Sequence, residues 1–376
     1  MPNRSCAVNM KPNPGIQEAG APAREVALAP AARHLPVLGS LGLRDPQARR
    51  VTYLRISLTD RCNYRCTYCM PPQGVELVPK PHLLTFEEIE RLARVFLQLG
   101  VRRLRLTGGE PTIRKDLLDL VSRLAALPGL QDLSLSTNGE ALGELAEPLR
   151  RAGLQRLNVS LDSLDPERFW RITRRGRLAE VLAGLDAAVA AGFTAIKLNA
   201  VAMRGFNDDE LGALCRFAWA RRMIPRFIEV MPMAAGELFV PGELLPAVEM
   251  RARIEAEFPG CALVPASGSA PGGGPARYYR LEGAGAPEGA EVGLITPMTE
   301  HFCDTCNRVR LSSVGTLHPC LAHDDGTDLR TPLRDGASDD TLRDLVKDAL
   351  SGKRDGHWFG LAGEGGPKRA MVSIGG

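Results

Sequence analysis

The chain has 376 residues, of which 44% are apolar and 24% are charged. This length allows one large α/β domain or two medium ones, and the composition excludes a chain that is disordered throughout. The 47 Lys and Arg residues against 44 Asp and Glu give a net charge of +3, too small an excess for a dedicated nucleic-acid-binding protein. Neither an apolar signal-peptide core nor a run of about 18 uncharged apolar residues occurs, so we expect a cytoplasmic protein without a membrane span.

A loose N-terminal extension is expected at residues 1–45, which are rich in Pro and Ala and follow neither helical nor strand periodicity. From residue 46 to residue 240, a β-rich run, a polar or Gly-rich loop and an amphipathic helix recur. The β-rich runs are Tyr53–Leu58, Arg102–Thr107, Asp132–Thr137, Arg156–Leu161, Ala195–Val201 and Pro225–Met231. The first helix should begin at Thr85, which forms a capping box with Glu88, and end before Gly100. Further helices are expected near 116–126, 140–151, 178–191 and 208–222.

Strict alternation of β and α elements predicts a parallel sheet with right-handed crossovers, and six strands are two fewer than a closed eight-stranded barrel needs. We therefore expect an α/β fold with a partial (β/α)6 barrel, although a doubly wound sheet would give the same pattern. Polar and Gly-rich segments gather at the C-terminal ends of the runs, where such sheets bind their ligands.

The pattern changes in the region 241–376, where we expect a smaller C-terminal α+β region. It begins with a helix at 243–257 and ends with a few short strands and a helix at 339–350. Between them, the stretch 265–290 is rich in Gly, Pro and Ala. We interpret this stretch as a flexible surface loop, because such a composition buries too little apolar area to offset the entropy of ordering.

Three of the nine cysteines, Cys62, Cys66 and Cys69, follow the first β-rich run with the spacing C-x3-C-x2-C. Clustered cysteines without an export signal indicate metal or redox chemistry rather than disulfides. Three thiolates on a [4Fe–4S] cluster leave one of the four irons open to a ligand that is not protein. A closed zinc site needs four ligands, and no fourth lies close by in the sequence, so we favour the cluster. The isolated Cys6, Cys215 and Cys261 are interpreted as stray or buried small residues.

A second triplet, Cys303, Cys306 and Cys320, has the spacing C-x2-C-x13-C. A second three-cysteine cluster fits this spacing. A zinc ribbon fits it equally well, because His301, His318 and His323 are near enough to supply a fourth ligand.

Five cationic residues accompany these motifs. Arg55, Arg105 and Lys197 interrupt β-rich runs where apolar residues are expected, and Arg308 and Arg310 follow Cys306 closely. Each alone fits a structural ion pair or a surface side chain. Together they predict a pocket for an anion such as a nucleoside triphosphate, which carries about four negative charges.

Several segments resemble the GTP 3′,8-cyclase family of molybdenum-cofactor biosynthesis, within the radical S-adenosylmethionine (SAM) superfamily. They are RISLTDRCNYRCTYCM, Gly108-Gly109-Glu110-Pro111, NVSLD, FIEVM, HFCDTCNRVRLSSVGTLHPC and the final KRAMVSIGG. The resemblance extends from about residue 45 to the C-terminus. It implies two [4Fe–4S] clusters, one on each cysteine triplet, and SAM as a further cofactor.

The resemblance also implies which residues bind each ligand. SAM would be contacted by Tyr68, Gly109, Glu110, Ser160 and Met231. GTP would be contacted by Arg55, Arg105, Ser136, Lys197, Arg308 and Arg310, with its guanine on the open iron of the second cluster. Many relatives carry Thr where this chain has Ser136, so the hydroxyl is kept. The terminal Gly375 and Gly376 would insert toward the active site and be needed for activity.

The implied reaction begins when a 5′-deoxyadenosyl radical from SAM removes the 3′ hydrogen of GTP. The C3′ radical then adds to guanine C8, giving 3′,8-cyclo-7,8-dihydro-GTP. The resemblance further implies an external electron donor, a homodimer and a separate cyclic pyranopterin monophosphate synthase downstream. Two alternatives stay open: another radical SAM enzyme with an auxiliary cluster, such as a peptide-modifying one, and a non-catalytic zinc-binding module.

Overall fold

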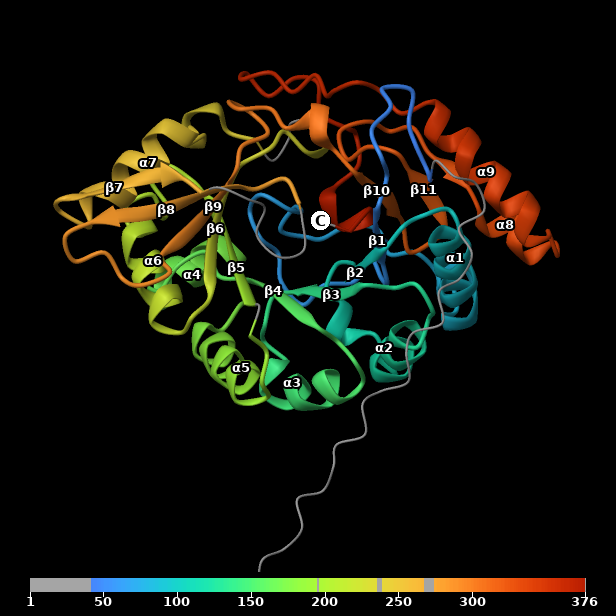
Figure 1. The fold of residues 1–376 in the computed structure, drawn as a ribbon, viewed down its shortest axis with the longest axis horizontal. Helices are drawn as coiled ribbons and strands as arrows, with labels where there is room; N and C mark the ends of the chain where they lie inside the picture. Colours follow the sequence, from blue (N-terminus) through green and yellow to red (C-terminus); the bar gives the residue numbers. More distant parts are fainter. Residues whose placement is uncertain (1–41, 195, 235–238, 267–273, 376) are drawn as a thin grey trace, which may run out of the picture. The chain divides into compact units, whose positions relative to one another are not determined.

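One twelve-stranded sheet, in the order β12-β11-β10-β1-β2-β3-β4-β5-β6-β9-β8-β7, organises the described residues (Figure 1). The computed structural model describes residues 42–194, 196–234, 239–266 and 274–375, so most of the expected extension, with Cys6, lies outside them. The central strands are β1 Tyr53–Ser57, β2 Arg103–Thr107, β3 Asp132–Thr137, β4 Arg156–Ser160, β5 Ile196–Ala202 and β6 Ile224–Glu229. They pair in parallel in this order, which confirms the six expected strands to within two residues at each end.

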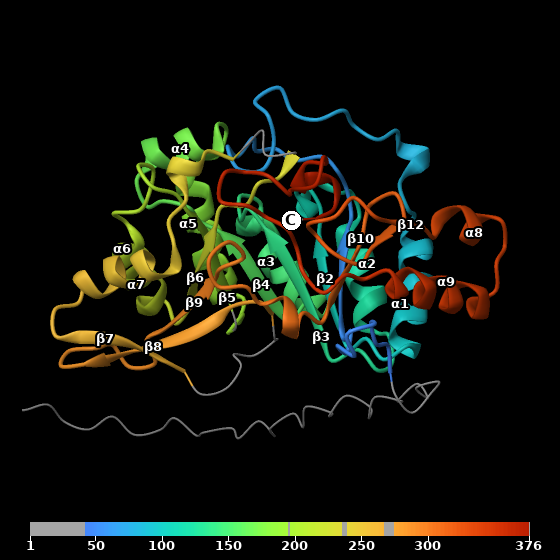
Figure 2. The same cartoon turned by 90° about the horizontal axis from the view of Figure 1, so that it is seen from above.

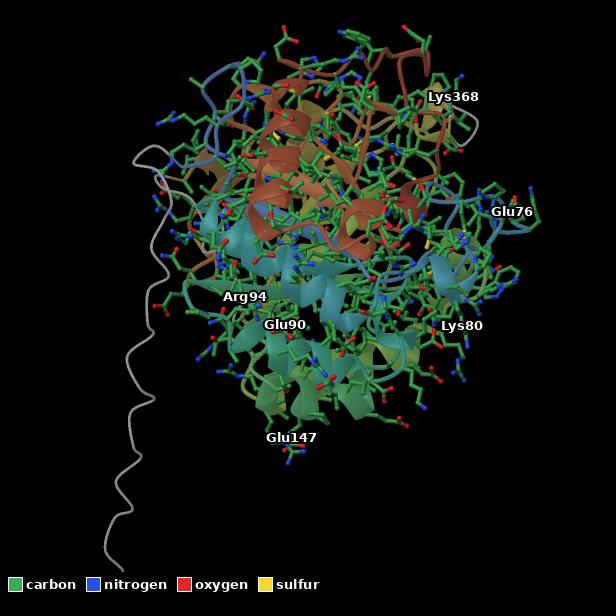
Figure 3. All side chains as sticks on the ribbon, turned by 90° about the vertical axis from the view of Figure 1, so that its right-hand side faces the viewer. Glu76, Lys80, Glu90, Arg94, Glu147 and Lys368 are labelled. Atoms are coloured by element: carbon green, nitrogen blue, oxygen red, sulfur yellow. The ribbon has the colours of Figure 1, made fainter. Side chains whose placement is uncertain are left out.

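Helices between these strands cover one face of the sheet (Figures 1 and 2). They are α1 Phe86–Gln98, α2 Leu117–Ala125, α3 Leu142–Arg151, α4 Pro166–Thr173, α5 Leu178–Ala190 and α6 Leu211–Ala220. The capping box before α1 is confirmed: Thr85 Oγ1 accepts from the Glu88 amide at 3.2 Å, and the Glu88 carboxylate accepts from the Thr85 amide at 2.8 Å. On the solvent side of α1, Glu90 and Arg94 form an ion pair at 2.7 Å (Figure 3). No helix in the described ranges is long and apolar enough to cross a bilayer.

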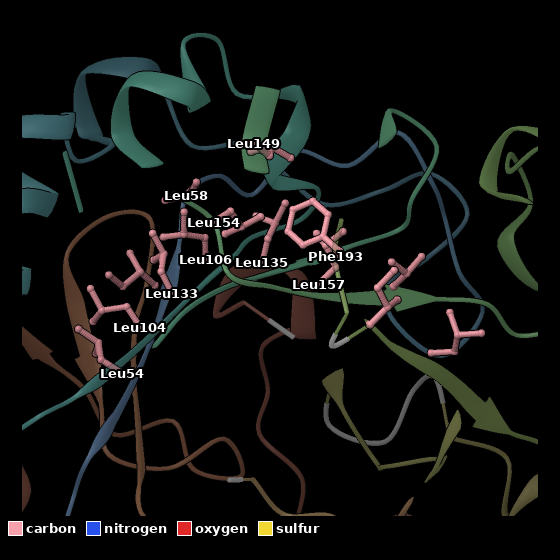
Figure 4. Packing of buried hydrophobic residues seen from close by; sticks show 14 of the residues in the cluster. Leu54, Leu58, Leu104, Leu106, Leu133, Leu135, Leu149, Leu154, Leu157 and Phe193 are labelled. Atoms are coloured by element: carbon pink, nitrogen blue, oxygen red, sulfur yellow. The ribbon is translucent and has the colours of Figure 1, made fainter. Parts of the chain in front are cut away.

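The central strands alternate between apolar and polar side chains, and this alternation separates the core from the site. Apolar residues such as Leu104, Leu106 and Leu135 are fully buried against the helices (Figure 4). Between them stand Arg105, Ser134, Ser136 and other polar residues, which therefore belong to the opposite face. The fold thus gives that face a polar and cationic surface.

The C-terminal region extends the same sheet at both edges. After α7 Ala247–Ala256 come β7 Cys261–Pro265, β8 Arg277–Gly283 and β9 Glu291–Ile295; after these come β10 Arg308–Leu311, β11 Thr316–His318, β12 Thr327–Asp328, α8 Arg330–Arg334 and α9 Asp339–Ser351. Strand β9 pairs in parallel with β6, and β10 pairs in parallel with β1. Within the described ranges the strand order is linear, so the expected barrel stays open.

The expected surface loop at 265–290 is wrong in part, because it contains β8. This strand pairs in antiparallel fashion with both β7 and β9, and its Leu281 is buried. The run Arg277–Leu281 carries two tyrosines and a leucine, which favour a strand. The Gly- and Pro-rich residues around it dominated the average composition. Residues 267–273 of the stretch lie outside the described part.

Candidate functional site

A cavity of about 300 Å³ lies at the C-terminal ends of the central strands. Both cysteine triplets line it. So do the following expected site residues: Arg55, Tyr68, Arg105, Gly109, Glu110, Ser136, Ser160, Met231, Arg308 and Arg310. Lys197 is buried in the same sheet but is not part of the cavity lining. Gly375 packs against Thr107, which does line the cavity. Gly376 lies outside the described residues.

The first triplet, Cys62, Cys66 and Cys69, lies on the loop after β1. The Cys69 amide donates to the Cys66 carbonyl at 3.0 Å, which turns the loop so that all three thiols line the cavity. Burial raises the pKa of Cys62 to about 11 and that of Cys69 to about 12, and it also raises the pKa of Cys66 well above the ordinary value of a thiol. Because iron binds thiolates, cluster binding here must displace the thiol protons.

Gly108 and Gly109 allow the loop after β2 to lie against the first-triplet loop. A Cβ on Gly109 would lie 2.1 Å from the Arg61 carbonyl oxygen, and the Gly109 amide donates to the Thr59 carbonyl at 2.6 Å. Sequence reasoning expected the glycines to let backbone approach a ligand. The structure shows that the two glycines let the backbone after β2 approach the loop that carries the first cysteine triplet.

Glu110 ties this loop to the end of β3. Its carboxylate accepts from the Thr112 amide and hydroxyl, the Thr137 hydroxyl and the Asn138 amide, at 2.6–3.0 Å. Burial nevertheless raises the pKa of this carboxyl group. Three of these donors meet Oε1 and only the Asn138 amide meets Oε2, so Oε2 keeps an acceptor position for a further donor.

Tyr68 is held by a residue that sequence reasoning missed, Asp162. The Tyr68 hydroxyl donates to Asp162 Oδ2 at 2.8 Å, and Asp162 Oδ1 accepts from the Val201 amide at 2.8 Å. Burial raises the pKa of Asp162 to about 6. Asp162 therefore fixes the orientation of the Tyr68 ring between two cysteines of the first triplet. Its only sequence signal was its position two residues after Ser160.

The second triplet, Cys303, Cys306 and Cys320, has a more electropositive environment. Burial raises the pKa of Cys303. Burial also acts to raise the pKa of Cys306, but the positive charges of Arg308 and Lys353 outweigh it and lower this pKa to about 6. Arg308 Nη2 lies 3.5 Å from the Cys306 sulfur. Local charge thus favours the thiolate form of Cys306.

The histidines considered as a fourth zinc ligand have other partners. His301, His318 and His323 contact the carbonyls of Pro297, Asp325 and Gly356, respectively, at 2.8–2.9 Å. Among the described residues, no three side chains of His, Cys, Asp or Glu are grouped so as to hold a single metal ion.

A layer of cations crosses the polar face of the sheet. The strand registers align Arg310 with Arg55 and Arg55 with Arg105. Burial, and then the charges of Arg310 and Arg105, lower the pKa of Arg55. Burial, and then the charges of Arg226 and Arg105, lower the pKa of Lys197 to about 6. Such crowding of buried cations is relieved by an anionic ligand.

Arg226 is a cavity-lining cation that sequence reasoning missed. It lies on β6, is 2% exposed, and donates to Asn199 Oδ1 at 2.9 Å and to Asn158 Oδ1 at 2.7 Å. Both partners are neutral, so its charge is available to a ligand. The signal that selected Lys197, a charge inside a β-rich run, was present here too.

The C-terminal tail enters the arc of strands (Figure 1). A short 3-10 helix, Met371–Ser373, places Val372 and Ile374 in buried positions. The Gly375 carbonyl then accepts a hydrogen bond from Arg310 Nη1. A Cβ on Gly375 would lie 2.1 Å from Thr107 Oγ1, so only glycine fits at this position.

The fold and the two triplets define a radical SAM protein, and comparison with known proteins agrees. Residues 56–218 match the radical SAM superfamily, and residues 223–359 match the Molybdenum Cofactor Synthesis C family. A GTP 3′,8-cyclase of Hydrogenovibrio crunogenus is 42% identical over 89% of this chain and 100% of its own length. One of Pelotomaculum thermopropionicum is 45% identical, again over 89% of this chain and 100% of its own. The chain therefore belongs to the GTP 3′,8-cyclase family.

Among solved structures, Streptococcus suis SuiB bound to S-adenosylmethionine is similar, with a TM-score of 0.46 and 17% identity. The similarity covers 55% of this chain and 47% of SuiB. The cavity itself fits the cofactors of the family: each triplet provides three cysteine donors, the set that leaves one iron of a [4Fe–4S] cluster open.

Proposed function

We propose that this chain converts GTP to 3′,8-cyclo-7,8-dihydro-GTP with SAM as cofactor, the first step of molybdenum-cofactor biosynthesis. The observation that carries the proposal is the single cavity that contains both cysteine triplets and the cationic layer. One triplet alone would fit any radical SAM enzyme. The second triplet, surrounded by Arg55, Arg308 and Arg310, fits a nucleotide whose base lies at a cluster and whose phosphates meet cations.

The chain's own residues would bind, orient and enclose the reactants. Each triplet would hold one [4Fe–4S] cluster, and the first would supply the electron that cleaves SAM to a 5′-deoxyadenosyl radical. SAM would lie against Tyr68, Gly109, Glu110, Ser160 and Met231. GTP would lie against Arg55, Arg105, Ser136, Lys197, Arg226, Arg308 and Arg310. The tail at Gly375 and Gly376 would close the cavity and exclude water from the radical.

The proposal includes a barrel part at 46–240 and a C-terminal part at 241–376, preceded by the extension at 1–45. The first part would bind SAM, and the second would bind the base of GTP. It also includes a cytoplasmic location, an external one-electron donor, a homodimer and a downstream cyclic pyranopterin monophosphate synthase. The donor is required because SAM cleavage consumes one electron, and the guanine radical left after C3′ adds to C8 takes up a second electron with a proton to give the product.

Anaerobic reconstitution followed by incubation with GTP, SAM and dithionite tests the proposal. We expect about eight irons per chain, which is two [4Fe–4S] clusters. We also expect a product of the mass of GTP whose ribose C3′ is bonded to C8. About four irons plus zinc, with SAM cleavage but no such product, would indicate another radical SAM enzyme. Zinc without iron would indicate the binding module.

GTP binding should be accompanied by proton uptake at Lys197. The pKa of about 6 means that this amine is mostly neutral at pH 7.5 in the free protein, and a bound triphosphate favours the ammonium form. GTP affinity should therefore fall as the pH rises above about 6. The charged or titratable groups facing Lys197 are Arg226 on β6, Arg103 and Arg105 on β2, Arg156 on β4 and Tyr278 on β8.

Isothermal titration at pH 7.5, in two buffers of different ionisation enthalpy, measures this uptake. On binding GTP, the Lys197→Met variant should take up fewer protons than the wild type, by at most about one proton per chain. It should also bind GTP about tenfold more weakly. Lys347→Met, which removes an exposed charge on α9, serves as the control. Equal proton uptake in the wild type and Lys197→Met would contradict the prediction.

A further inference from the structure

A buried lysine outside the proposed GTP-binding set lies beside the second triplet. Lys353 follows the end of α9 and is 3% exposed. Its ammonium nitrogen lies 2.7 Å from the Arg308 carbonyl, 2.8 Å from the Pro319 carbonyl and 3.8 Å from the Cys306 sulfur. Three acceptors match the three N–H groups of an ammonium.

These contacts join the two chain segments that carry two of the cysteines. Arg308 is two residues after Cys306, and Pro319 directly precedes Cys320. One side chain therefore holds both ends of the segment that joins Cys306 to Cys320. Losing it would leave two buried carbonyl groups short of a donor.

The charge of Lys353 also lacks a carboxylate partner in the described part of the chain. No ion pair with Asp or Glu occurs there; burial lowers the pKa of Lys353, and the groups that favour its charged form are the sulfurs of Cys306 and Cys320. A buried charge is stable only when it is paired and hydrogen-bonded. The thiolate ligands of a cluster on the second triplet supply that pairing.

The first triplet has no residue equivalent to Lys353 among the described residues. Within the described ranges, no Lys or Arg side chain hydrogen-bonds to the sulfur of Cys62, Cys66 or Cys69; Arg65 donates to the Cys62 carbonyl instead, at 2.7 Å. The two sites therefore differ in having a cation bonded to a cluster thiol, although each offers three cysteines.

We propose that Lys353 is a positioning and charge-compensating residue that raises the reduction potential of the second cluster relative to a site without it. Reduction by an external one-electron donor adds one negative charge to the cluster. A fixed positive charge and an N–H···S hydrogen bond stabilise that reduced form, and both are known determinants of cluster potential. The inference rests on the proposed function, because it requires a cluster on the second triplet.

The test is a redox titration of the reconstituted full chain, followed by electron paramagnetic resonance. At a fixed ambient potential, Lys353→Met should lower the ratio of reduced to oxidised second cluster about tenfold, which corresponds to about 59 mV for one electron. The first cluster should titrate as in the wild type. Repeating both measurements with alanine at the first triplet assigns the shifted signal to the second cluster.

Two further variants separate charge from structure. Lys347→Met removes a charge from the exposed surface of α9 and should leave both potentials unchanged. Lys353→Gln keeps a polar side chain of similar reach without the charge, and it decides the question if Lys353→Met loses the second cluster. A lowered potential in Lys353→Gln supports the inference.

The possible failures are distinguishable. About eight irons in the wild type and in Lys353→Gln, with equal potentials for the second cluster, would overturn the inference and leave the proposed function intact. A wild type with only about four irons would overturn both.

Discussion

Alanine at all three cysteines of the first triplet is expected to abolish SAM cleavage below detection. The same change at the second triplet should leave SAM cleavage measurable and abolish only the cyclised product. The physical reason is that each triplet offers three donors to one cavity, and only the first lies on the loop that contains Tyr68 and that Gly109 packs against. Each triple variant should retain about four of about eight irons.

The measurement pairs iron and sulfide counts with chromatographic detection of 5′-deoxyadenosine and of the GTP product. Cys261→Ala is the matched control, since this half-buried cysteine on β7 lies outside the cavity lining. It should keep all irons and both products. Loss of SAM cleavage in the second-triplet variant, with four irons still bound, would show that the assignment of the two sites is wrong.

The central fold could be predicted because its signals are local. The β/α alternation gave Asp132–Thr137 with the observed bounds, and the capping box at Thr85 marked the start of α1. Helix α4 was missed because it has only eight residues, too few for a clear helical period beside Pro166. Strand β8 was missed because its short run is surrounded by glycine and proline.

The extension of the sheet had no local signal. Pairing of β10 with β1 joins residues more than 250 positions apart, and β9 reaches β6 across α7 and a hairpin. These contacts depend on which edges the central strands leave open. The pairing of β10 with β1 positions the second triplet, because β10 begins two residues after Cys306 and brings that cysteine to the cavity.

In the site, too, residues marked by a local sequence pattern could be predicted, and residues defined by distances in the fold could not. Both triplets could be identified from the spacing of their cysteines. Arg226 could have been identified as Lys197 was, because each is a charged residue inside a β-rich run. Asp162 and Lys353 had no comparable signal, because their importance lies in distances to Tyr68 and Cys306. Lys353 stands in the polar segment GKRDG, which by composition indicates an exposed loop.

Gly375→Ala is expected to lower product formation by about 100-fold or more while both clusters remain bound. The new Cβ would lie 2.1 Å from Thr107 Oγ1, so the tail must move and the hydrogen bond from Arg310 to the Gly375 carbonyl is lost. A displacement of about 1 Å in a positioning element can cost about 100-fold in rate. Initial rates with GTP and SAM, together with the iron count, measure the effect.

Two companion variants separate the clash from backbone strain. Gly375 has a φ of 72°, where a side chain costs about 1–2 kcal/mol. Gly336 has a φ of 83° and no atom within 4 Å of its Cβ position, so Gly336→Ala carries the strain without the clash and should retain activity. Thr107→Ala removes the clashing oxygen and leaves a nearest contact of 3.2 Å, to Ser57 Cβ. Gly375→Ala should therefore cost less activity in a Thr107→Ala background than alone. Equal losses in both backgrounds would show that the tail acts through its backbone conformation and not through its fit against β2.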